Sequence, residues 1–212
     1  MDQKRNYQKE LEKKLKTLTE QACVPSLLLH SCCAPCSSYV LEYLSQYFKI
    51  TVFYYNPNIT QAEEYQKRVR EQKHLISRMP FKYPVDFLEG NYEPERFFAA
   101  VKGMEQVLEG GERCFACYRL RLEEAAIVCR EKGFDFFTTT LTISPLKNAG
   151  KLNEIGEALA AEYQVSFLNS DFKKKNGYKR SVELSGEYDL YRQDYCGCIF
   201  SRQERMRQDK KG

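Results

Sequence analysis

Short apolar runs alternate with longer amphipathic segments along most of the 212-residue chain. The apolar runs are rich in β-branched and aromatic residues, which predicts buried strands. The segments between them repeat apolar residues every three or four positions, which predicts helices. The predicted strands are Ser26–His30, Ile50–Tyr55, Val85–Leu88, Phe134–Leu141 and Val165–Leu168. The predicted helices are Tyr39–Phe48, Gln61–Met79, Pro94–Leu108, Phe115–Lys132 and Asn148–Tyr163, with one or two more after Asp171.

This alternation predicts an α/β fold of the Rossmann type, in which a parallel sheet has helices on both faces. We expect a single α/β domain over residues 23–212, with a small helical lobe formed by residues 94–108 and 115–132. An amphipathic N-terminal helix within residues 1–22 precedes this domain. Four apolar side chains on one face of that helix pack against the body: Tyr7, Leu11, Leu15 and Leu18.

Composition narrows the class of protein further. Apolar residues make up 42% of the chain and charged residues 29%, a balance that excludes disordered, collagen-like and coiled-coil proteins. No apolar run is long enough to span a bilayer, so we expect no membrane association. The charged N-terminal residues 1–16 lack the apolar segment of a signal peptide. We therefore expect a cytoplasmic protein.

The net charge of +4 is unevenly distributed. Residues 173–212 carry a net +5, and the rest of the chain carries −1. A basic end on a neutral body favours a phosphate-bearing partner, although a solvated basic tail explains the same excess. The basic segment contains a run of cations beside an aromatic ring, Tyr178, a pattern that can hold RNA phosphates and stack a base. These cations are Lys173, Lys174, Lys175, Lys179 and Arg180.

Cysteine is the most informative residue type, because there are nine cysteines beside two histidines. In a reducing compartment so many thiols favour metal binding or redox chemistry over a disulfide framework. Cys129 fits an apolar helix face and is expected in the core, while Cys23 stands alone. The other seven fall into three groups: Cys32, Cys33 and Cys36; Cys114 and Cys117; Cys196 and Cys198.

The first cysteine group lies in a turn between a predicted strand and helix, where three thiols can share one metal centre. Adjacent cysteines such as Cys32 and Cys33 suit a cluster better than a zinc ribbon, and no group contains a histidine. Together with Cys114 and Cys117 they supply enough thiolates for a closed cluster, which favours iron–sulfur over zinc while leaving zinc open. A C-x-C pair can bind metal or form a strained, reducible disulfide.

Two further features are less specific. The segment 138–145 places several hydroxyls after a predicted strand, where they can bind a polyol or a phosphate or simply reflect β-propensity and a turn. His30 precedes the first cysteine group and is either a support for a metal ligand or an ordinary structural residue.

Taken together, the motifs resemble the epoxyqueuosine reductases of the QueH type. The matching stretches are LLLHSCCAPCS, GERCFACYRLRLEEAA, TTTLTISPLKN and NSDFKKKNGYKRSVELSGEYDLYRQDYCGCIFS. They follow one another from Ser26 to Ser201, and the N-terminal helix lies outside them. The resemblance implies a HUP-like fold and the last step of queuosine formation, in which the epoxide of epoxyqueuosine at the tRNA wobble position is reduced by two electrons. It implies tRNAs with GUN anticodons and an electron donor that the sequence does not identify.

The resemblance also implies roles for individual residues. Four cysteines become ligands of a [4Fe-4S] cluster: Cys32, Cys33, Cys114 and Cys117. Cys196 and Cys198 become a redox-active pair. Cys36 stands where some members have Asp, at a position that can approach an additional iron ion beside the cluster. Apart from the resemblance, Asp194 and Tyr195 lie next to the redox pair in the sequence, which makes each a candidate for proton transfer or an ordinary structural residue.

Three other functions compete with this interpretation. A structural zinc protein that binds RNA would use the same cysteines and would contain zinc but no sulfide. An ATP-dependent tRNA-thiolating enzyme needs a glycine-rich phosphate loop after the first strand, where this chain has SCCAPCSS. A simple dithiol oxidoreductase would leave most of the thiols unexplained.

Overall fold

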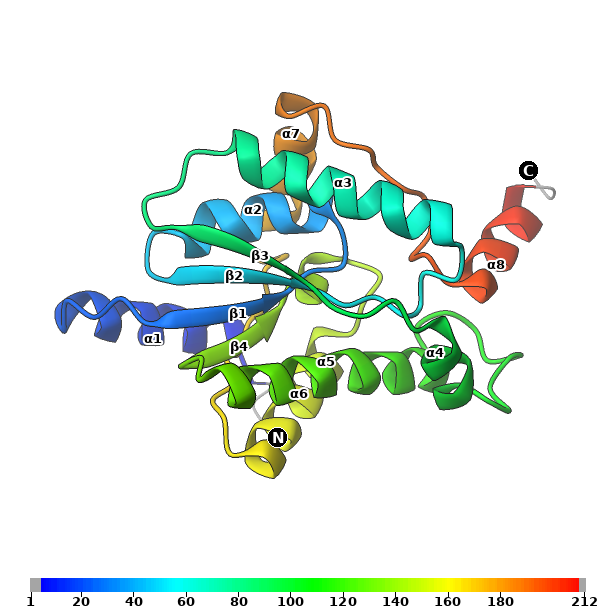
Figure 1. The fold of residues 1–212 in the computed structure, drawn as a ribbon, viewed down its shortest axis with the longest axis horizontal. Helices are drawn as coiled ribbons and strands as arrows, with labels where there is room; N and C mark the ends of the chain where they lie inside the picture. Colours follow the sequence, from blue (N-terminus) through cyan, green and yellow to red (C-terminus); the bar gives the residue numbers. More distant parts are fainter. Residues whose placement is uncertain (1–4, 210–212) are drawn as a thin grey trace.

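The structure, a computed structural model, describes residues 5–209 and confirms the predicted α/β class. Four parallel strands form a sheet in the order β3-β2-β1-β4 (Figure 1). The second and third strands therefore lie on one side of β1, and β4 pairs with β1 on the other side. The strands are β1 (Ser26–His30), β2 (Lys49–Tyr54), β3 (Val85–Glu89) and β4 (Phe136–Thr139).

Helices cover both faces of the sheet, with α2, α3 and α7 on one side and α5 and α6 on the other (Figure 1). Successive side chains of a strand point to opposite faces, so Leu27 and Leu29 of β1 join one core and Leu28 joins the other. The helices are α1 (Tyr7–Glu20), α2 (Ala34–Leu44), α3 (Ala62–Arg78), α4 (Pro94–Ala100), α5 (Glu112–Lys132), the 3-10 helix η1 (Thr140–Ile143), α6 (Ala149–Tyr163), α7 (Gly177–Glu187) and α8 (Ile199–Asp209).

Helix α1 confirms the predicted amphipathic N-terminal helix. Its three leucines, Leu11, Leu15 and Leu18, are buried in the same core as Leu27 and Leu29 of β1. The Asn6 side chain accepts a hydrogen bond from the backbone N–H of Lys9 at 3.1 Å and so caps the helix. Residues 1–4 of the predicted N-terminal segment and residues 210–212 of the basic segment lie outside the described residues.

Several predicted boundaries are wrong. Helix α2 begins at Ala34 instead of Tyr39, because Pro35 occupies its first turn and the extended Cys33 forms its N-cap. The helix predicted over residues 94–108 ends at Ala100 and is followed by turns, one of them at Gly103 with a φ of +81°. The strand predicted over residues 165–168 is reduced to one parallel bridge between Phe137 and Phe167.

Helix α7 returns the basic C-terminal segment to the sheet. It packs against α2 so closely that a Cβ on Gly177 would lie 2.5 Å from Cε1 of the Tyr39 ring, which belongs to α2. This packing brings the start of α7 beside the carboxyl ends of the strands, where ligands of such sheets bind. No helix within residues 5–209 is long and apolar enough to cross a membrane.

Candidate metal and redox site

A cavity of about 300 Å³ opens at the carboxyl end of β1. Its walls come from segments far apart in the sequence: the turn into α2, helix α3, the loop after η1, the start of α7 and the loop before α8. Residues singled out in the sequence line it, among them Cys32, Cys33, Cys36, Asp194 and Cys196. The topology therefore gathers the first cysteine group and one member of the C-x-C pair around one space.

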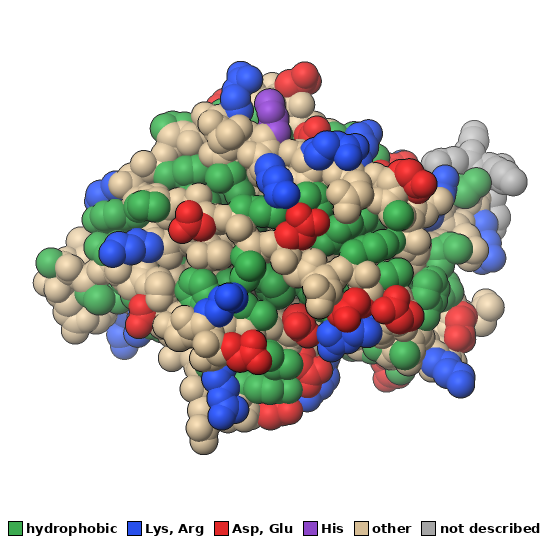
Figure 2. All heavy atoms as spheres, viewed as in Figure 1, with side chains coloured by type: hydrophobic (Ala, Val, Ile, Leu, Met, Phe, Trp, Pro, Cys, Tyr) green, Lys and Arg blue, Asp and Glu red, His purple; other side chains and the backbone are tan. Residues whose placement is uncertain are grey.

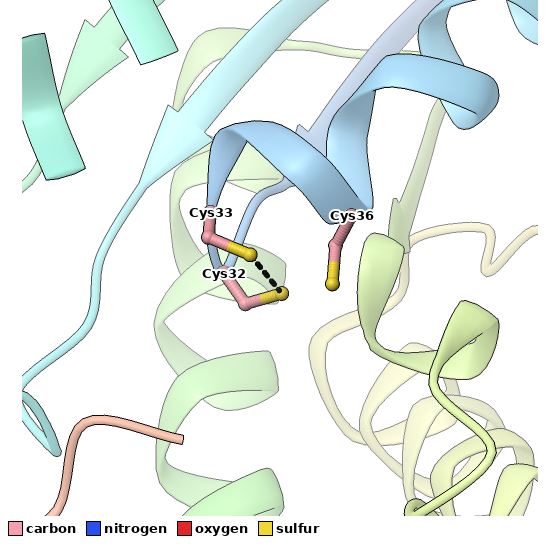
Figure 3. A group of neighbouring side chains, drawn as sticks. All are labelled: Cys32, Cys33 and Cys36. Atoms are coloured by element: carbon pink, nitrogen blue, oxygen red, sulfur yellow. Dashed lines mark hydrogen bonds between the residues drawn. The ribbon is translucent and has the colours of Figure 1, made fainter. Parts of the chain in front are cut away.

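Cys32, Cys33 and Cys36, the thiol triad, converge at the amino end of α2 (Figure 3). Their three Sγ atoms all lie within 4.8 Å of one another, and those of Cys32 and Cys33 are 3.8 Å apart. The first turn of a helix explains this convergence, because Cys33 caps α2 and Cys36 follows three residues later on the same side. Three sulfur atoms so placed can share a metal ion.

The triad favours a thiolate at Cys32. The Cys33 and Cys36 thiols hold the pKa of Cys32 well below its ordinary value, because both can donate to a Cys32 thiolate. The same interaction raises the pKa of Cys33 to about 11 and raises that of Cys36 strongly. The Thr140 hydroxyl donates to Cys32 Sγ at 3.4 Å and accepts from the Cys32 backbone N–H at 3.2 Å.

His30 is a structural residue, fully buried beneath the triad. Its Nε2 lies 3.1 Å from the carbonyl oxygen of Tyr55, so Nε2 carries the proton and Nδ1 accepts from the Thr139 hydroxyl at 2.9 Å. Burial, followed by the charge of Arg121, lowers the pKa of His30 to about 3. Both ring nitrogens are used and the ring is neutral, so His30 supports the floor of the site and offers no free ligand atom.

A second, smaller cavity of about 20 Å³ adjoins the first. Cys114 and Cys117, on the first turns of α5, line it together with Cys196 and Cys198. The backbone N–H of Gly110 donates to Cys114 Sγ at 3.2 Å. Burial raises the pKa of Cys114, and it raises that of Cys117 to about 11, so both are protonated thiols at neutral pH.

Four residues line both cavities and form their common wall: Glu109, Arg121, Lys147 and Cys196. Burial opposes the charge of Lys147, but Cys196, Tyr118 and Cys32 outweigh burial and raise its pKa above the ordinary range. Burial, and then Cys196, raises the pKa of Glu109. Its carboxylate accepts from the Ser201 hydroxyl at 2.8 Å. Charged side chains thus line the wall that the two cavities share, between the two sets of thiols.

The turn Cys196-Gly197-Cys198, the dithiol turn, brings two thiols together with their Sγ atoms 3.5 Å apart. The Cys198 thiol, and beyond it the Lys147 ammonium, lowers the pKa of Cys196 well below its ordinary value. The Ser201 backbone N–H donates to Cys198 Sγ at 3.3 Å. Neighbouring thiols of unequal pKa are suited to thiol–disulfide exchange, because one of them supplies the thiolate.

Helix α3 and the loop before it hold the dithiol turn in place. Arg68 Nη1 donates to the carbonyl oxygen of Cys196 at 3.2 Å, and its guanidinium is bound to Glu64 at 2.7 Å. Asn58 Nδ2 donates to the same carbonyl oxygen at 3.3 Å. The Thr60 backbone N–H donates to the carbonyl oxygen of Gly197 at 3.3 Å. The turn therefore depends on residues more than a hundred positions earlier.

The sequence-predicted thiols thus occupy two adjoining spaces. The structure gathers Cys32, Cys33 and Cys36 in one group and places the C-x-x-C pair, Cys114 and Cys117, in the neighbouring cavity. Cys129 is buried in the core, with its Sγ donating to the carbonyl oxygen of Phe134 at 3.4 Å, and Cys23 is exposed. Asp194 is exposed at the rim of the larger cavity, and the Tyr195 ring lies under the Arg68 guanidinium.

The five cations predicted to bind RNA differ in their partners. Lys173 pairs with Asp171 at 2.8 Å, Lys175 with Glu12 at 2.5 Å, and Arg180 with Glu42 at 2.7 Å. Lys174 and Lys179 are exposed and make no ion pair with any residue that the structure describes. Figure 2 shows Lys and Arg side chains mixed with Asp and Glu over one face of the molecule, with no single cationic patch there.

The threonine segment, which spans the end of β4 and the 3-10 helix η1, does not present the row of free hydroxyls that the sequence allowed. Thr138 donates to the carbonyl oxygen of Leu168 at 2.8 Å, and Thr142 lies 3.0 Å from the Ser170 hydroxyl. Thr139 contacts His30, and Thr140 contacts Cys32. All four hydroxyls are buried and satisfied inside the protein, so the segment supports the site instead of forming a phosphate or polyol site of its own.

Sequence reasoning missed the charged side chains of the site. Arg68, Arg121, Glu109 and Lys147 lie on separate elements, and only the fold brings them to one cavity wall. Lys147 falls inside the motif stretch TTTLTISPLKN, and Arg121 falls inside GERCFACYRLRLEEAA. Their place in these stretches is the feature of the sequence that could have identified them as site residues. Nothing in the spacing of Arg68 or Glu109 distinguishes them from ordinary surface charges.

Comparison with known proteins assigns the family. Residues 27–204 match the family described as "Epoxyqueuosine reductase QueH". The proteins of that name from Streptococcus pyogenes serotype M1 and Staphylococcus epidermidis are 44% and 43% identical to the chain, covering 94% of it in each case and 79% and 86% of their own lengths. The one from Thermotoga maritima is 35% identical over 85% of the chain and 92% of its own length. The chain belongs to the epoxyqueuosine reductase QueH family.

Proposed function

We propose that the chain reduces epoxyqueuosine to queuosine in tRNA at a metal centre held by its cysteines, with the dithiol turn as a second redox group. Family membership carries the reaction, which makes the chain an oxidoreductase of tRNA queuosine modification. In this reaction both C–O bonds of the epoxide break and a C=C bond forms. Two electrons and two protons are consumed, and the oxygen leaves as water.

The convergence of the triad sulfurs within 4.8 Å is the observation that supports a metal centre. The donor set contains only thiols, which suits iron–sulfur sites. Each iron of a cluster takes its own cysteine, so ligands divided between adjoining cavities fit a cluster better than a single ion. We propose that Cys32, Cys33, Cys114 and Cys117 hold a [4Fe-4S] cluster and that Cys36 faces an additional iron ion. When bound, iron supplies Lewis acidity and single electrons.

The remaining groups of the site bind substrate and carry protons. Glu109 faces both cavities, and its raised pKa keeps it protonated to a higher pH than an ordinary carboxyl group. Lys147 on the same wall keeps its charge near Cys196. The exposed Lys174, in the loop before α7, and Lys179, on α7, can hold RNA phosphates of the substrate.

The dithiol turn can supply two electrons when Cys196 and Cys198 form a disulfide and release two protons. Cys196 lines the cavity of the triad, which supports this role. We expect Cys196→Ser to abolish repeated turnover that is driven by a thiol reductant. Full multiple-turnover activity in that variant would refute the dithiol role.

The experiment that tests the function uses anaerobically purified protein and an epoxyqueuosine-containing tRNA with a GUN anticodon. The expected result is conversion to queuosine, measured in nucleoside digests, by wild type and by Cys23→Ser, which changes an exposed cysteine outside the site. Cys33→Ser removes a triad thiol and should give no product. Conversion by Cys33→Ser at the wild-type rate would contradict the metal-dependent mechanism.

A further inference from the structure

Arg121 carries a buried positive charge that no carboxylate of the described chain neutralises. Its side chain lies on α5, one turn after Cys117, and the residue is 3% exposed. One Nη2 hydrogen bond goes to the neutral amide oxygen of Asn56. The Nε–H is buried and has no hydrogen-bond partner. Within residues 5–209, no Asp or Glu forms an ion pair with Arg121.

Two other arginines show that this arrangement is unusual in the molecule. Arg68 is 2% exposed and paired with Glu64 at 2.7 Å, and Arg113 is 2% exposed and paired with Glu204 at 2.8 Å. Burying a charge without a partner is strongly unfavourable, because the ion loses its hydration and gains no attraction in return. A chain that pairs its other buried arginines therefore points to a counter-charge for Arg121 that is not a carboxylate.

The position of Arg121 identifies the chemistry of that counter-charge. Arg121 lines both cavities, between the thiol triad and the C-x-x-C pair. The guanidinium therefore lies close to both sets of thiols. The neighbouring His30 is neutral and buried, and it offers no negative charge. An anionic thiolate–metal centre is the group that would neutralise a cation at this point.

We propose that Arg121 is the counter-cation of the thiolate–metal centre and raises the reduction potential of that centre. The inference rests on the metal centre of the proposed function. Reduction adds one electron from the reductant and makes the centre more negative, so a nearby fixed cation stabilises the reduced state more than the oxidised state. Arg121 is therefore a positioning residue: it acts through the charge of the centre, and its Nε–H remains available to a sulfur acceptor.

The test compares Arg121→Gln and Arg121→Lys with Arg119→Gln, a change on the same helix at a side chain that is 46% exposed and paired with Glu162. Iron content is measured first, and the midpoint potential is then measured by an anaerobic optical titration with dithionite and mediators. We expect Arg121→Gln to lower the ratio of reduced to oxidised centre at fixed potential at least tenfold, which is about 59 mV for a one-electron couple. Arg121→Lys should shift the potential less, and Arg119→Gln should leave it unchanged.

An unchanged potential in Arg121→Gln at normal iron content would overturn the inference. If that variant does not fold, Asn56→Asp replaces it, because a carboxylate beside the guanidinium neutralises the charge while keeping Arg121 in place. Asn56→Asp should then lower the potential, and an unchanged value overturns the inference equally. A wild-type protein with no redox-active metal would instead refute the proposed centre, and the inference with it.

Discussion

The thiol triad and the dithiol turn face the same cavity, yet different kinds of contact hold them there. The triad is local: Cys32, Cys33 and Cys36 lie within five residues at the junction of β1 and α2, and the capped helix turn aims their sulfurs at one point. The dithiol turn is tied to the fold by long-range hydrogen bonds from Arg68, Asn58 and Thr60.

This difference separates two properties of the site. A strand–helix turn forms as soon as the sheet forms, so the triad is preorganised wherever the core is intact. A loop held by a few side chains can move when one contact is lost, while the core stays folded. Substitutions outside the site should therefore affect the dithiol turn far more than the triad, and the following variants test this expectation.

Cys33→Ser should have the largest effect, because it changes the triad from within. Cys33 is buried at the N-cap of α2 and contributes one of the three convergent sulfurs. We expect near-complete loss of bound metal with little change in the far-UV circular dichroism spectrum. Metal analysis of the anaerobically purified variant checks this, with Cys23→Ser as the matched control. Retention of the full wild-type metal content would show that the triad is not the metal site.

Arg68→Ala should detach the dithiol turn and leave the triad in place. The change leaves Glu64 without its buried partner and the carbonyl oxygen of Cys196 without its guanidinium donor. Removing one partner of a buried ion pair costs about 3–5 kcal/mol of unfolding free energy. Urea unfolding measures the loss, and hydrogen exchange should show faster opening of residues 195–198 than of residues 32–36.

The exposed Arg70, on the same helix, provides the control for Arg68. Arg70→Ala should change the unfolding free energy by less than about 0.5 kcal/mol, as is usual for surface substitutions. Equal protection of residues 195–198 in Arg68→Ala and wild type would contradict the view that α3 holds the dithiol turn.

Gly197→Ala should produce a smaller and more local change. Gly197 has a φ of +110°, and a Cβ there would lie 2.7 Å from Ile59 Cγ1. A side chain in this strained region costs roughly 1–3 kcal/mol. We expect the thiol–disulfide potential of Cys196 and Cys198 to shift while metal content is unchanged, as measured by equilibration with glutathione. The control is Gly186→Ala, which should not destabilise the protein because an added Cβ there meets no other atom. If Gly197→Ala keeps the wild-type dithiol potential and stability, the geometry of the turn is not fixed as described.

Lys179→Gln should have the smallest effect, because it changes only one exposed side chain of α7. Lys179 is exposed and makes no ion pair within the described residues, whereas Lys175 is paired with Glu12. If Lys179 contacts a phosphate, its loss should weaken tRNA binding and reduce the salt slope of log Kd by about 1. Filter binding at several salt concentrations checks this. If Lys175→Gln reduces the salt slope of log Kd more than Lys179→Gln does, then Lys175 and not Lys179 contacts the phosphate.

The same contrast explains how much the sequence could predict. The triad could be recognised because its members are neighbours in the chain, and β1 was predicted with its observed bounds because Ser26–His30 is an isolated apolar run. The start of α2 was missed although Pro35, typical of a first helical turn, marked it. Cys36 consequently belongs to the helix and not to a preceding loop.

The charged residues of the site could not be predicted from the sequence, because long-range contacts bring them together. Arg68, Glu109 and Arg121 become part of one site only when α3, the turn before α5 and α5 itself meet around the strand ends. Their spacing within their own segments matches that of ordinary helix or turn charges. The basic C-terminal segment illustrates the converse: it was visible from net charge, but ion pairs to Glu12 and Glu42 neutralise part of it.

We propose that the triad and the C-x-x-C pair serve one iron–sulfur centre across the two cavities. Iron and acid-labile sulfide analysis of anaerobically purified protein, with an optical spectrum, tests it most directly in wild type and in Cys117→Ser. We predict iron and sulfide in the wild type with the absorption of a [4Fe-4S] cluster, and loss of both sulfide and absorption in Cys117→Ser. Zinc without sulfide in the wild type, or an intact cluster in Cys117→Ser, would contradict the claim.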